Sequence, residues 1–168
     1  MNTIQKNSAS RFLYAKLLAL LVLFTFSTNG LLAQENDAPA TEESRLAIST
    51  GFLMGGGGLI GADLEFMPTN RLGLQAGVGL GSFGFGLNYH FQDRINSSFI
   101  SLVYWQQGLG DNHYASYVGP LYTFRARRFF QASVGYGLVV NEGPAIRGTR
   151  YEGTTASLLF NIGLFFPL

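Results

Sequence analysis

The sequence contains no cysteine, and it contains no lysine beyond Lys16. The absence of cysteine excludes disulfide bonds, thiolate metal sites, a cysteine nucleophile and lipid attachment to a cysteine after export. Charge is also scarce, because only 12% of the residues are charged, whereas soluble domains contain roughly a quarter. The surface of the folded chain therefore cannot be covered with charge in the usual way.

Long hydrophobic runs are missing too, although 47% of the residues are hydrophobic and 14% are aromatic. After the N-terminal segment, no uninterrupted apolar stretch approaches the roughly 20 residues of a membrane-spanning helix. A chain of 168 residues that is apolar overall, but never for long, favours a single domain of β-strands.

Basic residues are too few for binding to nucleic acid. Lys6, Arg11 and Lys16 lie in the N-terminal segment, and without them eight arginines stand against ten acidic residues, a net charge of −2. Nucleic-acid binding depends on clustered basic charge, so we expect no such partner.

The N-terminal segment has the three parts of a secretory signal peptide. Its basic residues precede the ten-residue apolar run Leu17–Phe26, and Ala33 offers a small residue at a cleavage site. A single transmembrane anchor is disfavoured because this run is short for a spanning helix. We therefore predict a signal peptide over residues 1–33 and a flexible, acidic lead-in over residues 34–45.

From Leu46 onward, apolar residues alternate with small or polar residues, which is the period of a β-strand with one apolar face. The pattern places Phe85 and Leu87 on the apolar face, with Gly86 and Asn88 on the other, and it also places Met54 on the apolar face. Pro120 is expected at a bulge, because proline cannot donate to a strand ladder. Eight strands are predicted, over residues 46–54, 59–67, 71–80, 83–92, 97–106, 114–124, 129–140 and 155–168.

The connections between these strands alternate in length. One series is tight and polar (68–70, 93–96 and 125–128), whereas the other includes the longer loops 107–113 and 141–154, with short flexible turns at 55–58 and 81–82. Short turns at one end and long loops at the other are typical of outer-membrane barrels, whose short turns face the periplasm. In lipid an unpaired strand edge costs several kcal/mol per exposed backbone group, so we expect an all-β fold closed into an eight-stranded antiparallel up-and-down barrel.

Residues 46–168 resemble the small eight-stranded outer-membrane barrels typified by the OmpA transmembrane domain and OmpX. The resemblance rests on strand number, alternation and the aromatic-rich final segment Ser157–Leu168, although the chain ends in Pro167-Leu168 and not in an aromatic residue. It implies a monomer in the outer membrane of a Gram-negative-type cell, with membrane lipid and the barrel-assembly machinery as partners. Members of this group serve as anchors, adhesins or lipid-modifying enzymes, so the fold alone does not determine the function.

The inner face of the predicted barrel carries the candidate functional residues. Asp63 and Glu65 share that face, and an ion-pair network with an inward arginine such as Arg125 is favoured over acid–base chemistry. Hydrolysis by histidine and serine is disfavoured, because neither His90 nor His113 has a serine two residues away. The predicted lumen network comprises Asp63, Glu65, Gln75, Asn88, His90, Gln131 and Asn161, and we expect no catalytic residue, metal or cofactor.

Glycine is unusually frequent on the inner face, and two explanations are open. The glycines either allow tight packing around the large inward residues, which are Trp105, Tyr117, Leu121 and Phe165, or they line a small cavity for an apolar ligand. The Gly79–Gly84 segment matches G-x-G-x-x-G but precedes a strand, so a hairpin turn is favoured over a nucleotide site. The function predicted is a non-enzymatic structural or surface-interaction barrel; a barrel that binds or transports a lipid ligand is the alternative, and a lipid-modifying enzyme is the third.

Overall fold

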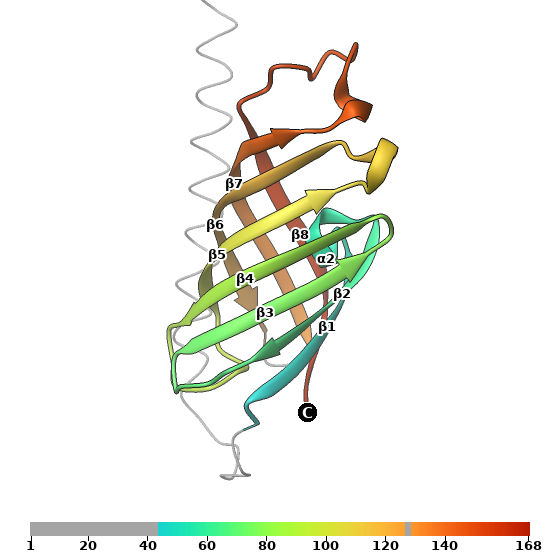
Figure 1. The fold of residues 1–168 in the computed structure, drawn as a ribbon. Helices are drawn as coiled ribbons and strands as arrows, with labels where there is room; N and C mark the ends of the chain where they lie inside the picture. The colour runs from blue at the N-terminus through green and yellow to red at the C-terminus, as the bar shows by residue number, and fades with distance from the viewer. Residues whose placement is uncertain (1–43, 127–128) are drawn as a thin grey trace, which may run out of the picture. The chain divides into compact units, whose positions relative to one another are not determined.

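The computed structural model describes residues 44–126 and 129–168, and these form a closed barrel (Figure 1). Eight antiparallel strands follow one another in chain order, and β1 pairs with β8 to close the ring. This confirms the predicted eight-stranded antiparallel barrel. The predicted signal peptide and most of the predicted lead-in lie outside the described residues. The elements are β1 (Leu46–Phe52), α2 (Met54–Gly57), β2 (Ile60–Phe66), β3 (Leu72–Gly79), β4 (Ser82–His90), β5 (Phe99–Gln107), η1 (Gly110–Asn112), β6 (Ala115–Arg125), β7 (Phe130–Glu142), η2 (Pro144–Ile146) and β8 (Ala156–Pro167).

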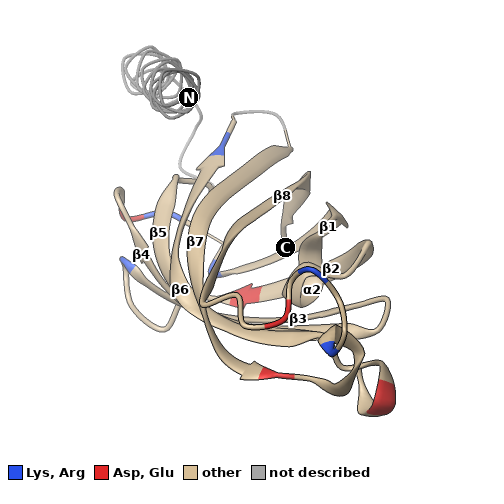
Figure 2. Ribbon diagram, turned by 90° about the horizontal axis from the view of Figure 1, so that it is seen from above, with Lys and Arg blue, Asp and Glu red and all other residues tan. Residues whose placement is uncertain are grey.

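The two faces of the wall follow the predicted alternation. Leu74, Leu87 and Leu102 are register partners on three adjacent strands, and each is about half exposed on the outside. The residue after Leu87, Asn88, points inward and is fully buried. Apart from Glu142 at the end of β7, every charged residue of a strand is buried on the inner side. Figure 2 accordingly shows a wall that is almost entirely uncharged.

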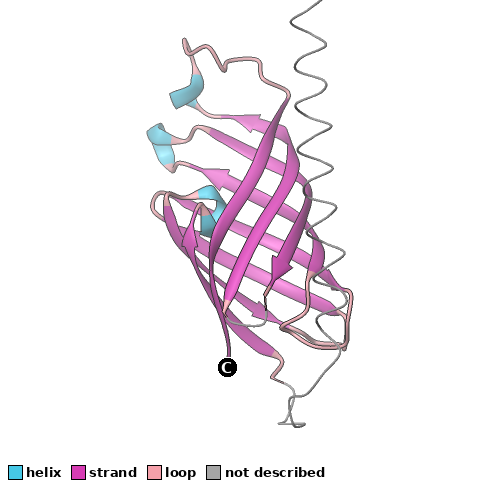
Figure 3. Cartoon of the chain, turned by 180° about the vertical axis from the view of Figure 1, so that it is seen from behind, coloured by secondary structure: helices cyan, strands magenta, loops and turns pink. Residues whose placement is uncertain are grey.

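The two ends of the barrel differ. The end that holds the C-terminus carries the turns β2–β3, β4–β5 and β6–β7, and we call it the terminus end. The opposite end, the loop end, carries α2, η1, η2 and the longest connection, residues 143–155 (Figure 3). None of the helices in the described part of the chain is long and apolar enough to span a membrane.

The connection between β1 and β2 is not the flexible turn that the sequence predicts. Leu53 adopts a left-handed conformation with φ 57°, which ends the alternation of β1. Met54 therefore turns inward and is fully buried, so its predicted place on the outer face is wrong. Gly55 and Gly56 continue with φ 63° and 81°, a conformation that costs glycine little. The resulting short helix α2 packs against β1, β2, β3, β4, β5 and β8, inside the ring of strands (Figure 2).

Two further predictions about the strands are corrected. The bulge expected at Pro120 lies instead between Ser116 and Tyr117. Pro120 stays in register opposite Leu102, because a missing N–H removes one ladder bond without requiring an extra residue. The β4–β5 turn runs over residues 91–98 and is longer than the predicted 93–96, because Ile95 and Ser97 fold inward and are buried.

Candidate functional site in the barrel lumen

Glu65 on β2 is the centre of a polar cluster inside the barrel. Its Oε1 accepts a hydrogen bond from the Asn88 amide and lies 2.9 Å from Nε2 of His90, both on β4. Its Oε2 lies 2.7 Å from a guanidinium nitrogen of Arg125 on β6. The side chains of Glu65 and Arg125 are each only 2% exposed. Both carboxylate oxygens are thus bound by groups from other strands.

The Arg125 guanidinium is also fixed by hydrogen bonds and by aromatic rings. Its Nε donates to Oε1 of Gln131 at 3.1 Å, and a second nitrogen donates to the carbonyl of Ile95 in the inward-folded turn. Its guanidinium also lies over the rings of Phe99 and Phe165, at 4.7 and 4.8 Å from their centroids. Charge pairing, hydrogen bonds and aromatic stacking together compensate for burial of the cation.

Most of the residues predicted for the lumen network join this cluster. Gln75 accepts from the Asn88 amide at 3.1 Å, and Gln131 also accepts from Oγ of Ser49 at 3.1 Å. Asp63 is buried on the same face, but its carboxylate accepts from the Gly55 amide of α2 at 3.3 Å. Asn161 is buried on β8, and no side-chain hydrogen bond joins it to the cluster among the described residues. The structure therefore brings five of the seven residues together and leaves Asp63 and Asn161 outside the cluster.

Ser97 is the member that sequence reasoning missed. It lies seven residues after His90, and the inward fold of the β4–β5 turn brings its Oγ to 3.0 Å from Nδ1 of His90. Glu65, His90 and Ser97 therefore stand in the order carboxylate, imidazole, hydroxyl that activates nucleophiles in hydrolases. His90 and Ser97 are both 0% exposed, and the Ser97 hydroxyl is also 3.2 Å from the carbonyl of Gln92, to which it donates. No substrate carbonyl can reach this hydroxyl in the observed arrangement.

The half of the lumen nearer the loop end is filled by α2. The Gly55 amide donates to Oδ2 of Asp63 at 3.3 Å, and Oγ of Ser82 donates to the Gly55 carbonyl at 2.7 Å. A β-carbon at Gly61 would lie 2.3 Å from the carbonyl oxygen of Met54, and one at Gly84 would lie 3.0 Å from Cα of Gly56. Inward glycines are thus needed where α2 meets the wall. We call residues 54–57 with these contacts the α2 plug.

The remaining side of the lumen is apolar. Trp105, Tyr117 and Leu121, which were predicted to fill the interior, pack together with Val103, Ala115 and Leu159. Phe165 is buried as well, but it contacts Arg125 instead. Of the two explanations for the glycine-rich face, packing is therefore the one that the contacts support, and part of what packs there is backbone of the α2 plug.

Nothing in the lumen is arranged as a metal centre, since no group of three or more His, Asp or Glu residues in the described ranges has the geometry to hold an ion. No family model, curated protein or solved structure matches the chain. Clues to the function therefore come from the wall and the lumen of the barrel.

Proposed function

We propose that the chain is an integral outer-membrane barrel with a non-enzymatic structural or surface-interaction role, exported by its N-terminal signal peptide. The observation that carries this proposal is the outer face. Large apolar side chains lie exposed on it from strand after strand, and no charged residue interrupts them before the strand ends. Soluble monomers rarely expose apolar patches larger than a few hundred Å², whereas lipid is the natural contact of a closed wall of this kind. Examples are Ile48, Leu64, Val78, Phe85, Leu102, Leu138 and Phe160.

A belt of outward aromatic residues near the terminus end also supports membrane insertion. Phe91 packs against Tyr122 with centroids 6.1 Å apart, and Phe129 packs against Phe166 at 5.4 Å. Phe66 and Tyr89 lie exposed at the same end of their strands. Aromatic girdles of this kind mark the membrane–water interface in barrels.

The filled lumen favours a structural or surface role over transport. The α2 plug contacts six strands, the apolar cluster occupies the opposite side, and the Glu65–Arg125 cluster crosses the terminus-end half. The glycine-lined interior proposed for an apolar ligand is thus occupied by the protein itself. The loop end instead presents exposed side chains such as Arg147, Arg150 and Tyr151, which suit contact with a partner outside the cell.

The test is reconstitution of the mature chain into phospholipid vesicles. We expect the protein to float with the vesicles in a density gradient and to migrate differently on gels before and after boiling. Recovery of a folded protein in the vesicle-free fraction would contradict membrane insertion. Uptake of a hydrophobic dye into the lumen would favour the ligand-binding alternative, and release of lysophospholipid, detected by mass spectrometry and abolished by Ser97→Ala, would favour the enzyme.

A further inference from the structure

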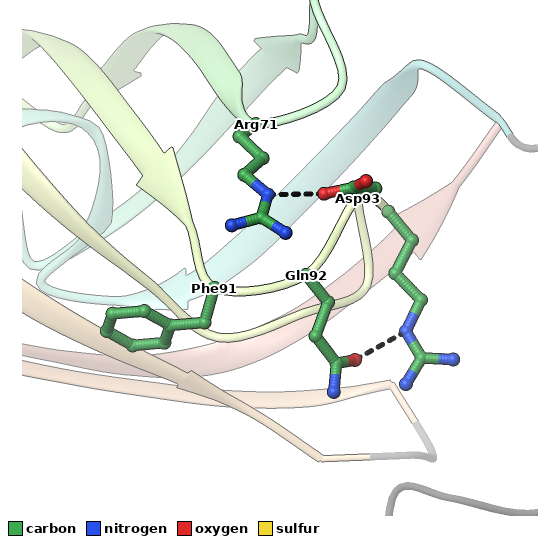
Figure 4. Close-up of a pocket in the computed structure, with 5 residues that line it drawn as sticks. Arg71, Phe91, Gln92 and Asp93 are labelled. Atoms are coloured by element: carbon green, nitrogen blue, oxygen red, sulfur yellow. Dashed lines mark hydrogen bonds and ion pairs between the residues drawn. The ribbon is translucent and has the colours of Figure 1, made fainter.

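A shallow pocket of about 360 Å³ lies at the terminus end, outside the lumen, and it is lined by Arg71, Phe91, Gln92, Asp93 and Arg94 (Figure 4). It forms where the chain enters β3 and leaves β4, which are neighbouring strands. The amide of His90 donates to the carbonyl of Arg71 at 2.8 Å and fixes this junction. The pocket is therefore part of the barrel's rim.

The outward residues next to the pocket indicate its level relative to the membrane. Leu72 and Tyr89 are register partners, 42% and 49% exposed on the outer face, and Arg71 directly precedes Leu72. If the outer face contacts acyl chains, the pocket lies at the level of the phospholipid headgroups. The inference made here rests on the membrane insertion proposed above.

The pocket is rich in cationic donors. Nε of Arg71 binds the Asp93 carboxylate. A guanidinium has five N–H donors, and Figure 4 shows the terminal nitrogens of Arg71 pointing toward the segment of Phe91 and Gln92. Arg94 donates through Nε to Oε1 of Gln92 at 2.8 Å, so its guanidinium is also fixed at this pocket.

Charge and shape at this rim favour an anion with an apolar tail. A second small pocket shares Asp93 and adds Arg45, so that the described residues lining the two pockets include three arginines and one aspartate. Phe91, 39% exposed, contributes an apolar wall beside them. Guanidinium groups recognise phosphate through charge-assisted hydrogen bonds, and basic residues at a membrane surface attract anionic lipid.

We propose that the Arg71–Arg94 pocket binds the phosphate of an anionic glycerophospholipid in the periplasmic leaflet. The acyl chains of that lipid lie along the outer faces of β3 and β4, over residues such as Leu72, Leu74 and Leu87. An anionic headgroup is favoured over a zwitterionic one because arginine exceeds aspartate among the described residues that line the two pockets.

The test counts lipids bound to the full mature chain, folded in detergent micelles, by native mass spectrometry during titration with phosphatidylglycerol or phosphatidylcholine. We expect tighter binding of phosphatidylglycerol, and a loss of about fivefold in affinity for each arginine removed in Arg71→Gln/Arg94→Gln. The matched control is Arg147→Gln/Arg150→Gln, which removes two exposed arginines from the loop end and should leave binding unchanged. Heat-modifiable gel mobility verifies that each variant is folded.

Asp93→Asn gives an independent readout, because it removes the competing carboxylate from Arg71 and should strengthen phosphatidylglycerol binding. Equal binding of both lipids by the wild type, equal losses in both arginine pairs, or complete displacement by inorganic phosphate at the same concentration would each overturn the proposal. Failure of the chain to enter vesicles would contradict the proposed function, whereas insertion without headgroup selectivity would contradict only the lipid site.

Discussion

Glu65 and Arg125 lie on β2 and β6, four strands apart in either direction around the barrel, and their charged groups meet across the lumen at 2.7 Å. This ion pair connects opposite walls. Around it, Asn88 and His90 bind the second carboxylate oxygen of Glu65, and Gln131 accepts from Nε of Arg125. A buried pair of this kind need not exceed an apolar replacement in stability, but removal of one partner leaves an uncompensated charge.

The first prediction concerns this pair. Arg125→Met should lower the free energy of unfolding by about 3–5 kcal/mol, because Glu65 stays buried without its cation. Urea titration of the protein in lipid vesicles measures the change. The double variant Glu65→Gln/Arg125→Met should recover part of the loss, since neither charge remains. A single variant as stable as the wild type would show that the pair is not formed in the membrane.

The second prediction separates a membrane barrel from a soluble one. Leu87 on the wall and Leu109 in the β5–β6 loop are both 51% exposed, so an arginine at either position would be similarly accessible to water in a soluble protein. In a bilayer, Leu87→Arg near the middle of β4 should cost about 2–4 kcal/mol, whereas Leu109→Arg outside the hydrocarbon should cost almost nothing. Unfolding titrations in vesicles compare the two. Equal, small effects of both substitutions would indicate that β4 never contacts lipid.

The barrel wall could be predicted from the sequence because successive side chains of a strand point to opposite faces. The alternating apolar residues between Leu72 and Tyr89 therefore indicate which face is the outer one. The even number of alternating segments then determines the antiparallel ring. These are local properties, and the observed register of β3 with β4 agrees with them.

The contents of the lumen could not be predicted in the same way. The α2 plug depends on left-handed backbone at Leu53 and on close approach to strands far away in sequence. The four consecutive glycines Gly55–Gly58 do not indicate that the chain turns into the lumen there. Ser97 reaches His90 only because the turn folds inward. The inward direction of Asn88 was predicted, but its partners on other strands, Glu65 and Gln75, were not.

The third prediction tests the packing of the α2 plug against the barrel wall, with two glycines of similar backbone conformation. Gly56 (φ 81°) and Gly81 (φ 68°) both adopt left-handed angles, so alanine should cost either position roughly 1–2 kcal/mol. A β-carbon at Gly81 meets nothing within 4 Å, whereas one at Gly56 would lie 1.9 Å from the carbonyl oxygen of Phe83. Gly56→Ala should therefore be clearly more destabilising than Gly81→Ala in urea titrations. Equal effects would mean that the plug does not occupy the lumen.

The last prediction concerns orientation. Arg147 and Arg150 are exposed in the longest connection at the loop end, whereas Arg71 is exposed at the terminus end. Short turns of outer-membrane barrels face the periplasm, so the loop end should face the outside of the cell. Trypsin added to intact cells should therefore cut after Arg147 or Arg150 and spare Arg71, which should become sensitive only after the outer membrane is permeabilised. The variant Arg147→Gln/Arg150→Gln should resist trypsin in intact cells while folding normally, which identifies the cleaved bonds. Cutting at Arg71 in intact cells, with the longer loop spared, would reverse the orientation and would also place the Arg71–Arg94 pocket in the outer leaflet.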